Sequence, residues 1–142
     1  MSVQTPVLVV DTSVVAKWFL PPESDSDRAR RLLERHAREA VTLCAPSLMI
    51  WELGNVLRYK PWLTPSLVGE SLDTVIEVGI RLYDPSPSLI HRAVDISYQT
   101  GITVYDAAFV AIGDELACQL VTADERLASR VNSPSVQLLS QS

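Results

Sequence analysis

The chain has 142 residues, a net charge of −5 and 47% hydrophobic residues, which is the composition of a folded globular protein. At this length we expect one domain spanning residues 1–142. The acidic balance excludes a protein that holds nucleic acid by overall positive charge, so action on nucleic acid would need a metal ion or a local basic patch.

The sequence contains no apolar run long enough to span a membrane, and the N-terminal letters MSVQTP contain neither basic residues nor a long apolar stretch. We therefore expect a cytoplasmic protein with no membrane contact. Cys44 and Cys118 each lie in an apolar run, without the spacing of a metal-binding pair. This favours two buried thiols over a disulfide or a metal site.

The first informative stretch is an apolar run, Val7 to Val10, which is typical of a strand buried on both faces. Asp11 ends the run, and Thr12 and Ser13 follow at the start of a helix that we expect to reach Leu20, before two prolines. A carboxylate at this position either belongs to a ligand site at the edge of an α/β sheet or simply caps the helix.

The next helical pattern continues to Ala40, and we expect its inward side to be the set Leu32, Leu33, His36, Ala37 and Ala40. Its arginines share the opposite face, at spacings of three and four residues: Arg28, Arg31, Arg35 and Arg38. Such a face is more often solvated than bound to a phosphate backbone, and both interpretations stay open.

A second strand, VTLCA at residues 41–45, leads into a helix that Pro61 must end. Glu52 lies among apolar residues of this helix, so it either reaches water or points into a polar pocket. Asn55 lies nearly one turn further on and is a candidate hydrogen-bond partner for it.

The middle of the chain predicts helices over 64–79 and 89–99, with a short strand at 81–83 between them. Residues 102–104 are expected to be extended, and Asp106 begins a helix that reaches Cys118. A further strand at 119–122 is followed by Asp124, a short helix at 125–130 and an edge strand at 136–139. We interpret His36 and His91 as surface or packing residues.

The alternation of strands and helices predicts an α/β fold with three layers, α/β/α, around a mostly parallel sheet of four to five strands. Strands of such a sheet open on the same edge, which brings Asp11 and Asp124 together. Asp106 begins a helix near that edge, and Glu52 lies far enough along its own helix to return over the rim. Four carboxylates then face one small volume.

Four ionised carboxylates cannot share a small cavity unaided, because a pair about 4 Å apart repels by roughly 4 kcal/mol at an effective dielectric constant near 20. Either some are protonated or a hard cation lies among them. Oxygen ligands without histidine or cysteine favour Mg²⁺ or Mn²⁺, and such sites are the usual apparatus of phosphate-ester chemistry. Thr12, Ser13 and Thr122 supply hydroxyls that orient ligands or water.

In these motifs the chain resembles the PIN-domain family and, in size, its VapC toxins; the motifs are VVDTSVV, PSLMIWELGNVL, VYDAAFVAIG and LVTADERL. The resemblance implies a Mg²⁺- or Mn²⁺-dependent endoribonuclease on a five-stranded parallel sheet. It also implies a homodimer that acts on RNA and is silenced by a cognate antitoxin. By position, Asp11, Glu52, Asp106 and Asp124 are its metal ligands or their immediate support. Many members of the family carry a further acidic residue shortly after the last of these four. In this chain Glu125 directly follows Asp124.

Three other classes of protein fit these motifs less well. A phosphatase of the haloacid dehalogenase type needs a second aspartate two residues after the first, where Ser13 stands here. A response-regulator receiver needs an acidic pair and a late lysine. A catalytically silent binding module of the same fold would have lost some of the four acidic positions, and all four are filled.

Overall fold

The computed structural model describes residues 4–142, and its core is a five-stranded sheet in which every strand pair is parallel. The strands lie in the order β3-β2-β1-β4-β5. Their bounds are β1 Val7–Val10, β2 Thr42–Pro46, β3 Arg81–Tyr83, β4 Leu120–Thr122 and β5 Val136–Leu138. The predicted α/β class and parallel sheet are confirmed.

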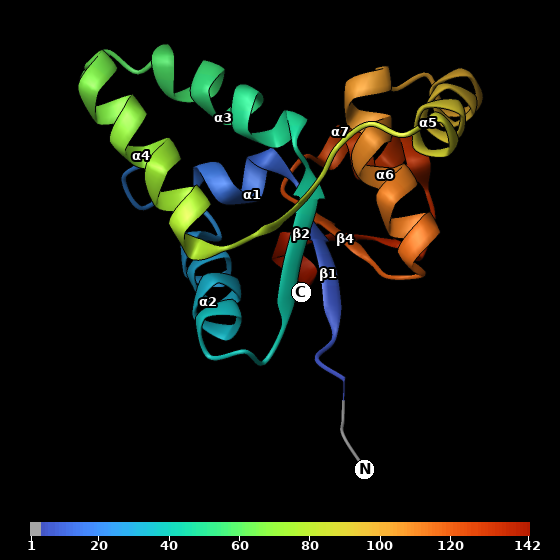
Figure 1. Ribbon diagram of the computed structural model, residues 1–142, viewed down its shortest axis with the longest axis horizontal. Coiled ribbons are helices and arrows are strands. Elements are labelled where there is room, and N and C mark those ends of the chain that lie inside the picture. The colour runs from blue at the N-terminus through green and yellow to red at the C-terminus, as the bar shows by residue number, and fades with distance from the viewer. Residues whose placement is uncertain (1–3) are drawn as a thin grey trace.

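Helices cover both faces of this sheet, as Figure 1 shows, with α2, α3 and α4 (blue to green) on one side and α5 and α6 (gold to orange) on the other. The helices are α1 Thr12–Ala16, α2 Ser26–Ala37, α3 Leu48–Arg58, α4 Pro65–Val78, α5 Pro87–Thr100, α6 Val104–Leu116 and α7 Glu125–Val131, with a 3₁₀ turn at Leu139–Gln141. No helix within residues 4–142 has the length and apolarity needed to cross a bilayer.

The central strand β1 is buried on both sides, which is why its sequence is an unbroken apolar run. Val9 lies against α6, where a Cβ on Gly113 would come within 3.8 Å of its side chain. Leu8 points the other way and shares a cavity with Leu32 of α2. The Gly113 position would also bring a Cβ within 3.1 Å of the Cys118 carbonyl, so glycine permits this close approach of α6.

The connections between the strands reverse direction beside β1. The chain first moves from β1 through β2 to β3, and then crosses back through α5 and α6 to β4 and β5. Because parallel crossovers are right-handed, the two directions place their helices on opposite faces. The reversal makes the carboxyl ends of β1 and β4 the topological switch point of the sheet, which is where α/β sheets bind ligands.

Three local expectations are wrong. The first helix stops at Ala16, and the next turn tightens to hydrogen bonds between residues three apart before the prolines. The second helix ends at Ala37, and both Ala37 and Ala40 are exposed. Of residues 102–104, Thr103 has the expected extended backbone, but Val104 already begins α6, which the Oγ1 atom of Thr103 caps.

His36 ties three elements together, in agreement with its interpretation as a packing residue. Its Nδ1 atom accepts a hydrogen bond from the amide of Leu43 in β2 at 3.1 Å. Its Nε2 atom lies 2.9 Å from the carbonyl oxygen of Val78 at the end of α4, so the neutral ring with a proton on Nε2 satisfies both contacts.

Replacing His36 by alanine should therefore lower the free energy of unfolding by about 1–3 kcal/mol, since it leaves the amide of Leu43 and the carbonyl of Val78 without these partners. Urea unfolding of His36→Ala measures the loss. His91→Ala is the control, because His91 is exposed on α5, and it should change stability by less than about 0.5 kcal/mol. Equal effects of the two substitutions would contradict a structural role for His36.

Candidate active site

Asp11 lies at the carboxyl end of β1 and is 7% exposed. Its backbone amide donates to the carbonyl of Val121 in β4 at 3.0 Å, which extends the strand pairing by one residue. One of its carboxylate oxygens, Oδ2, accepts from the side chains of Ser13 at 2.5 Å and Thr122 at 2.9 Å. Asp11 also occupies the cap position of α1, so the capping interpretation is confirmed, and the ligand-site interpretation stays a prediction.

The two hydroxyls on Asp11 are fixed in turn by the backbone that follows β4. The amide of Ala123 donates to Ser13 Oγ at 3.0 Å, and the amide of Asp124 donates to Thr122 Oγ1 at 3.0 Å. Each hydroxyl thus accepts from the backbone and donates its proton to the carboxylate. This chain orients Asp11 and couples the ends of β1 and β4.

Glu52 reaches the same edge from α3. Its Oε1 atom accepts from Thr12 Oγ1 at 2.8 Å, across 40 residues of sequence. Thr12 is 7% exposed, and Glu52 is half-buried. The structure therefore places Glu52 beside Asp11, the neighbour of Thr12.

The remaining two carboxylates stand at helix starts. Asp106 lies in the first turn of α6 and is half-buried. Asp124 caps α7, and its Oδ1 atom accepts from the amides of Arg126 at 3.0 Å and Leu127 at 3.1 Å. Both helices begin at the edge of the sheet where β1 and β4 end, as the sequence predicts.

Electrostatic effects link the four carboxylates: three of them have a raised pKa, and in each case the charge of at least one other member contributes. Burial raises the pKa of Asp11, and the charge of Asp124 raises it further, against hydrogen bonds from Ser13 and Thr122 that lower it. Burial also raises the pKa of Glu52, with further increases from the charges of Asp11 and Asp106. The pKa of Asp106 is raised by burial and by the charges of Asp11 and Asp124.

The donors of this cluster are carboxylate oxygens, the chemical type that a hard cation prefers. Among residues 4–142, hydrogen bonds engage one oxygen each of Asp11, Glu52 and Asp124, and the second oxygen of each has no such partner. Within that range no three acidic, histidine or cysteine side chains lie close enough together to hold a metal ion as they are placed. Magnesium commonly uses one or two carboxylates together with water, so the open oxygens match its needs.

One expected contributor, Asn55, lies apart from the cluster, and the nearby cation Lys17 is engaged elsewhere. Asn55 is exposed, and no hydrogen bond within residues 4–142 joins it to Glu52. Lys17, which follows α1, pairs with Glu23 at 3.1 Å and with the carbonyl of Ser24 at 2.9 Å. One cation near the cluster, Arg126, was not anticipated, although its place two residues after Asp124 was a usable signal.

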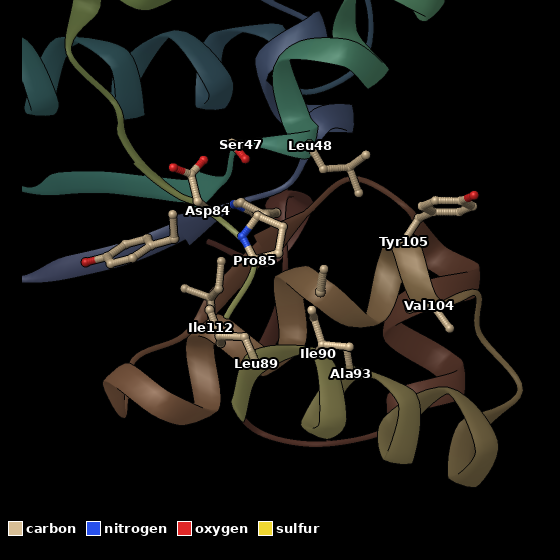
Figure 2. Close-up of a pocket in the computed structure, with 13 residues that line it drawn as sticks. Ser47, Leu48, Asp84, Pro85, Leu89, Ile90, Ala93, Val104, Tyr105 and Ile112 are labelled. Carbon is tan, nitrogen blue, oxygen red and sulfur yellow. The ribbon is translucent and has the colours of Figure 1, made fainter. Parts of the chain in front are cut away.

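Two other cavities are separate from the carboxylates. One, of about 230 Å³, has mainly apolar walls from α5, α6 and the ends of β2 and β3, and Figure 2 shows Pro85, Ile90 and Tyr105 around it. The other, of about 210 Å³, lies beside α2 and is lined in part by Arg28, Arg31 and Arg35. None of the four carboxylates lines either cavity.

The raised pKa of Asp11 predicts that metal-free protein loses stability as pH rises above about 4. In that range the folded chain holds a proton that the unfolded chain, with an ordinary value of 3.8, has released. Each unit of difference between the two states is worth about 1.4 kcal/mol. Asp11→Asn should remove this part of the pH dependence and be the more stable protein at neutral pH.

Urea unfolding in a chelator, at acidic and neutral pH, measures this difference. The control is Asp73→Asn, because Asp73 is exposed on α4. An Asp11→Asn profile that runs parallel to that of the unmodified chain would show that Asp11 is ionised over the whole range.

Comparison with known folds places this geometry in context. Curated protein sequences gave no match. The structure of PAE2754 from Pyrobaculum aerophilum has 20% identity and a TM-score of 0.66, over 98% of this chain and 93% of that one. A toxin–antitoxin complex from Klebsiella pneumoniae has 14% identity and a TM-score of 0.67, over 91% and 94% of the chains. VapBC2 from Rickettsia felis, bound to a promoter DNA fragment, has 18% identity and a TM-score of 0.66, over 93% and 96%.

At these identities the solved structures show a shared fold. A family model adds a match in sequence: the PIN domain matches residues 8–132, which span the sheet from β1 to β4 and all four carboxylates. The chain belongs to the PIN-domain family.

Proposed function

We propose that the chain is a divalent-metal-dependent endoribonuclease and the toxin of a toxin–antitoxin pair. The observation that carries the proposal is the convergence of Asp11, Glu52, Asp106 and Asp124 at the carboxyl ends of β1 and β4 of a PIN domain. Hydrolysis of an RNA phosphodiester needs an activated water and a counter-charge for the phosphate. A cluster of carboxylates with unused oxygens is suited to hold the ion that supplies both.

In this mechanism the four carboxylates hold Mg²⁺ or Mn²⁺, which when bound lowers the pKa of its water and offsets the charge of the phosphate. Ser13 and Thr122 keep Asp11 Oδ2 engaged, so that its other oxygen would be the one available to the ion. Thr12 does the same for Glu52. Fixing the ligands before the ion arrives lowers the cost of organising the site.

A protein partner is part of the proposal. The Klebsiella and Rickettsia structures contain toxin–antitoxin pairs, which supports a cognate antitoxin for this chain and a role in the cytoplasm. The acidic chain, with its net charge of −5, suits a partner that contributes basic residues. Large exposed apolar side chains, such as Trp51 on α3 and Tyr98 on α5, are the kind of surface that an antitoxin or the second subunit of a homodimer covers.

The two alternative functions have less support. A silent binding module has no need for the hydrogen-bond chain that orients Asp11. A haloacid-dehalogenase-type phosphatase needs an acid at position 13, where Ser13 donates to Asp11 instead. Release of phosphate from a small phosphomonoester would favour the phosphatase, and a pocket that ignores divalent ions would favour the module.

Purified protein should cleave total RNA with Mg²⁺ and not in a chelator, and Asp106→Ala should lower the rate by about 100-fold or more. Mn²⁺ should raise the melting temperature of the unmodified chain, and Asp11→Asn should abolish both that shift and the cleavage. Asp73→Asn again serves as the control, and it should behave like the unmodified chain. Full cleavage by Asp106→Ala, or cleavage that survives the chelator, would refute the proposal.

A further inference from the structure

Arg126 stands at the rim of the carboxylate cluster. It is the second residue of α7, and its backbone amide donates to Asp124 Oδ1 at 3.0 Å. Its position is therefore fixed relative to a carboxylate of the site, and its side chain is exposed. From this position the flexible side chain of Arg126 can bring its guanidinium group to a ligand at the carboxylate cluster.

Arg126 stands beside the cluster through its backbone hydrogen bond to Asp124. Its charge lowers the pKa of Asp106, against the effects of burial and of the neighbouring carboxylates. Within residues 4–142 it forms no ion pair, whereas Lys17, Arg28 and Arg92 each pair with a carboxylate. Arg126 is therefore free to form hydrogen bonds with an incoming anion.

An RNA strand that binds at this cluster meets four carboxylates on a protein of net charge −5. One divalent ion offsets only part of that negative field, so a cation at the rim is needed where the strand passes. Arginine suits this task because its planar group binds phosphate oxygens in pairs and stays charged at any working pH. Lys17 cannot fill the role while it is held by Glu23 and Ser24.

We propose that Arg126 contacts a phosphate of the RNA strand bound at the carboxylate cluster. This inference rests on the proposed ribonuclease function and assigns to it a substrate-binding residue. The competing explanation is that Arg126 merely offsets the carboxylate charges of the free protein. The two differ in salt dependence, because only a phosphate contact releases a counterion from the RNA when the strand binds.

The test is the cleavage of a single-stranded RNA with Mg²⁺ over a series of salt concentrations. Arg126→Gln should lower kcat/KM by about 10-fold or more, mainly through a higher KM. The slope of log kcat/KM against log salt should become shallower by about 0.7, the value for one phosphate contact on a single strand. Arg126→Lys keeps the charge and should retain most of the original slope.

Arg130→Gln is the matched control, since Arg130 is also exposed and lies one turn further along α7. Its guanidinium lies over Gly101, where a Cβ would come within 3.0 Å of Nη1, so the substitution should leave rate and slope unchanged.

The outcomes distinguish failure of the phosphate contact from failure of the ribonuclease proposal. If the unmodified chain cleaves RNA and Arg126→Gln keeps the original slope, the phosphate contact is refuted and the ribonuclease proposal stands. A loss of activity at unchanged slope, with a lower melting temperature, would likewise refute the contact and assign Arg126 to stability. If the unmodified chain cleaves no RNA with Mg²⁺, both proposals fail.

Discussion

Asp11 is a carboxylate buried at the end of the central strand, and the surrounding donors offset only part of the cost of burying it. Hydroxyls from Ser13 and Thr122 and the amide of Ser13 all approach a single oxygen of its side chain. Burial and the charge of Asp124 still raise its pKa. A positive charge beside Asp11 would stabilise its ionised form, which is why the proposed function assigns a metal ion to this position.

The topology of the sheet explains why acidic residues that are far apart in the sequence lie near Asp11. The strand order reverses between β1 and β4. Three helices, α3, α6 and α7, begin near the carboxyl ends of these strands, and each carries one of the other acids at or near its start. Glu52, Asp106 and Asp124 therefore come from separate crossovers but act on one another through charge. Like charges held near one another by a rigid scaffold repel, and the metal ion of the proposed function would relieve that repulsion.

Much of this arrangement could be predicted from the sequence, because the signals are local. A buried parallel strand must be a continuous apolar run, and a polar residue at its end marks the edge of the sheet. That reasoning located Asp11, Asp124 and the parallel sheet. The order of strands and helices then indicated that Glu52 and Asp106 would reach the same edge.

The details that could not be predicted depend on tertiary geometry. Nothing in the sequence shows that the Thr12 hydroxyl meets Glu52, or that Asn55 turns to solvent. The early end of the first helix depends on how the turn before the prolines packs. Arg126 is an exposed arginine like several others by sequence, and only the fold places its charge near Asp106.

The measurement that tests the central claim most directly is a crystal structure of the protein grown with Mn²⁺, with the ion located by its anomalous scattering. We expect a manganese peak at the carboxyl ends of β1 and β4. The ion should be bonded to the carboxylate oxygen of Asp11 that Ser13 and Thr122 leave free, and to at least one of Glu52, Asp106 and Asp124. A site without manganese at these strand ends, in crystals that hold the ion elsewhere, or a peak bonded only to surface carboxylates, would contradict this expectation.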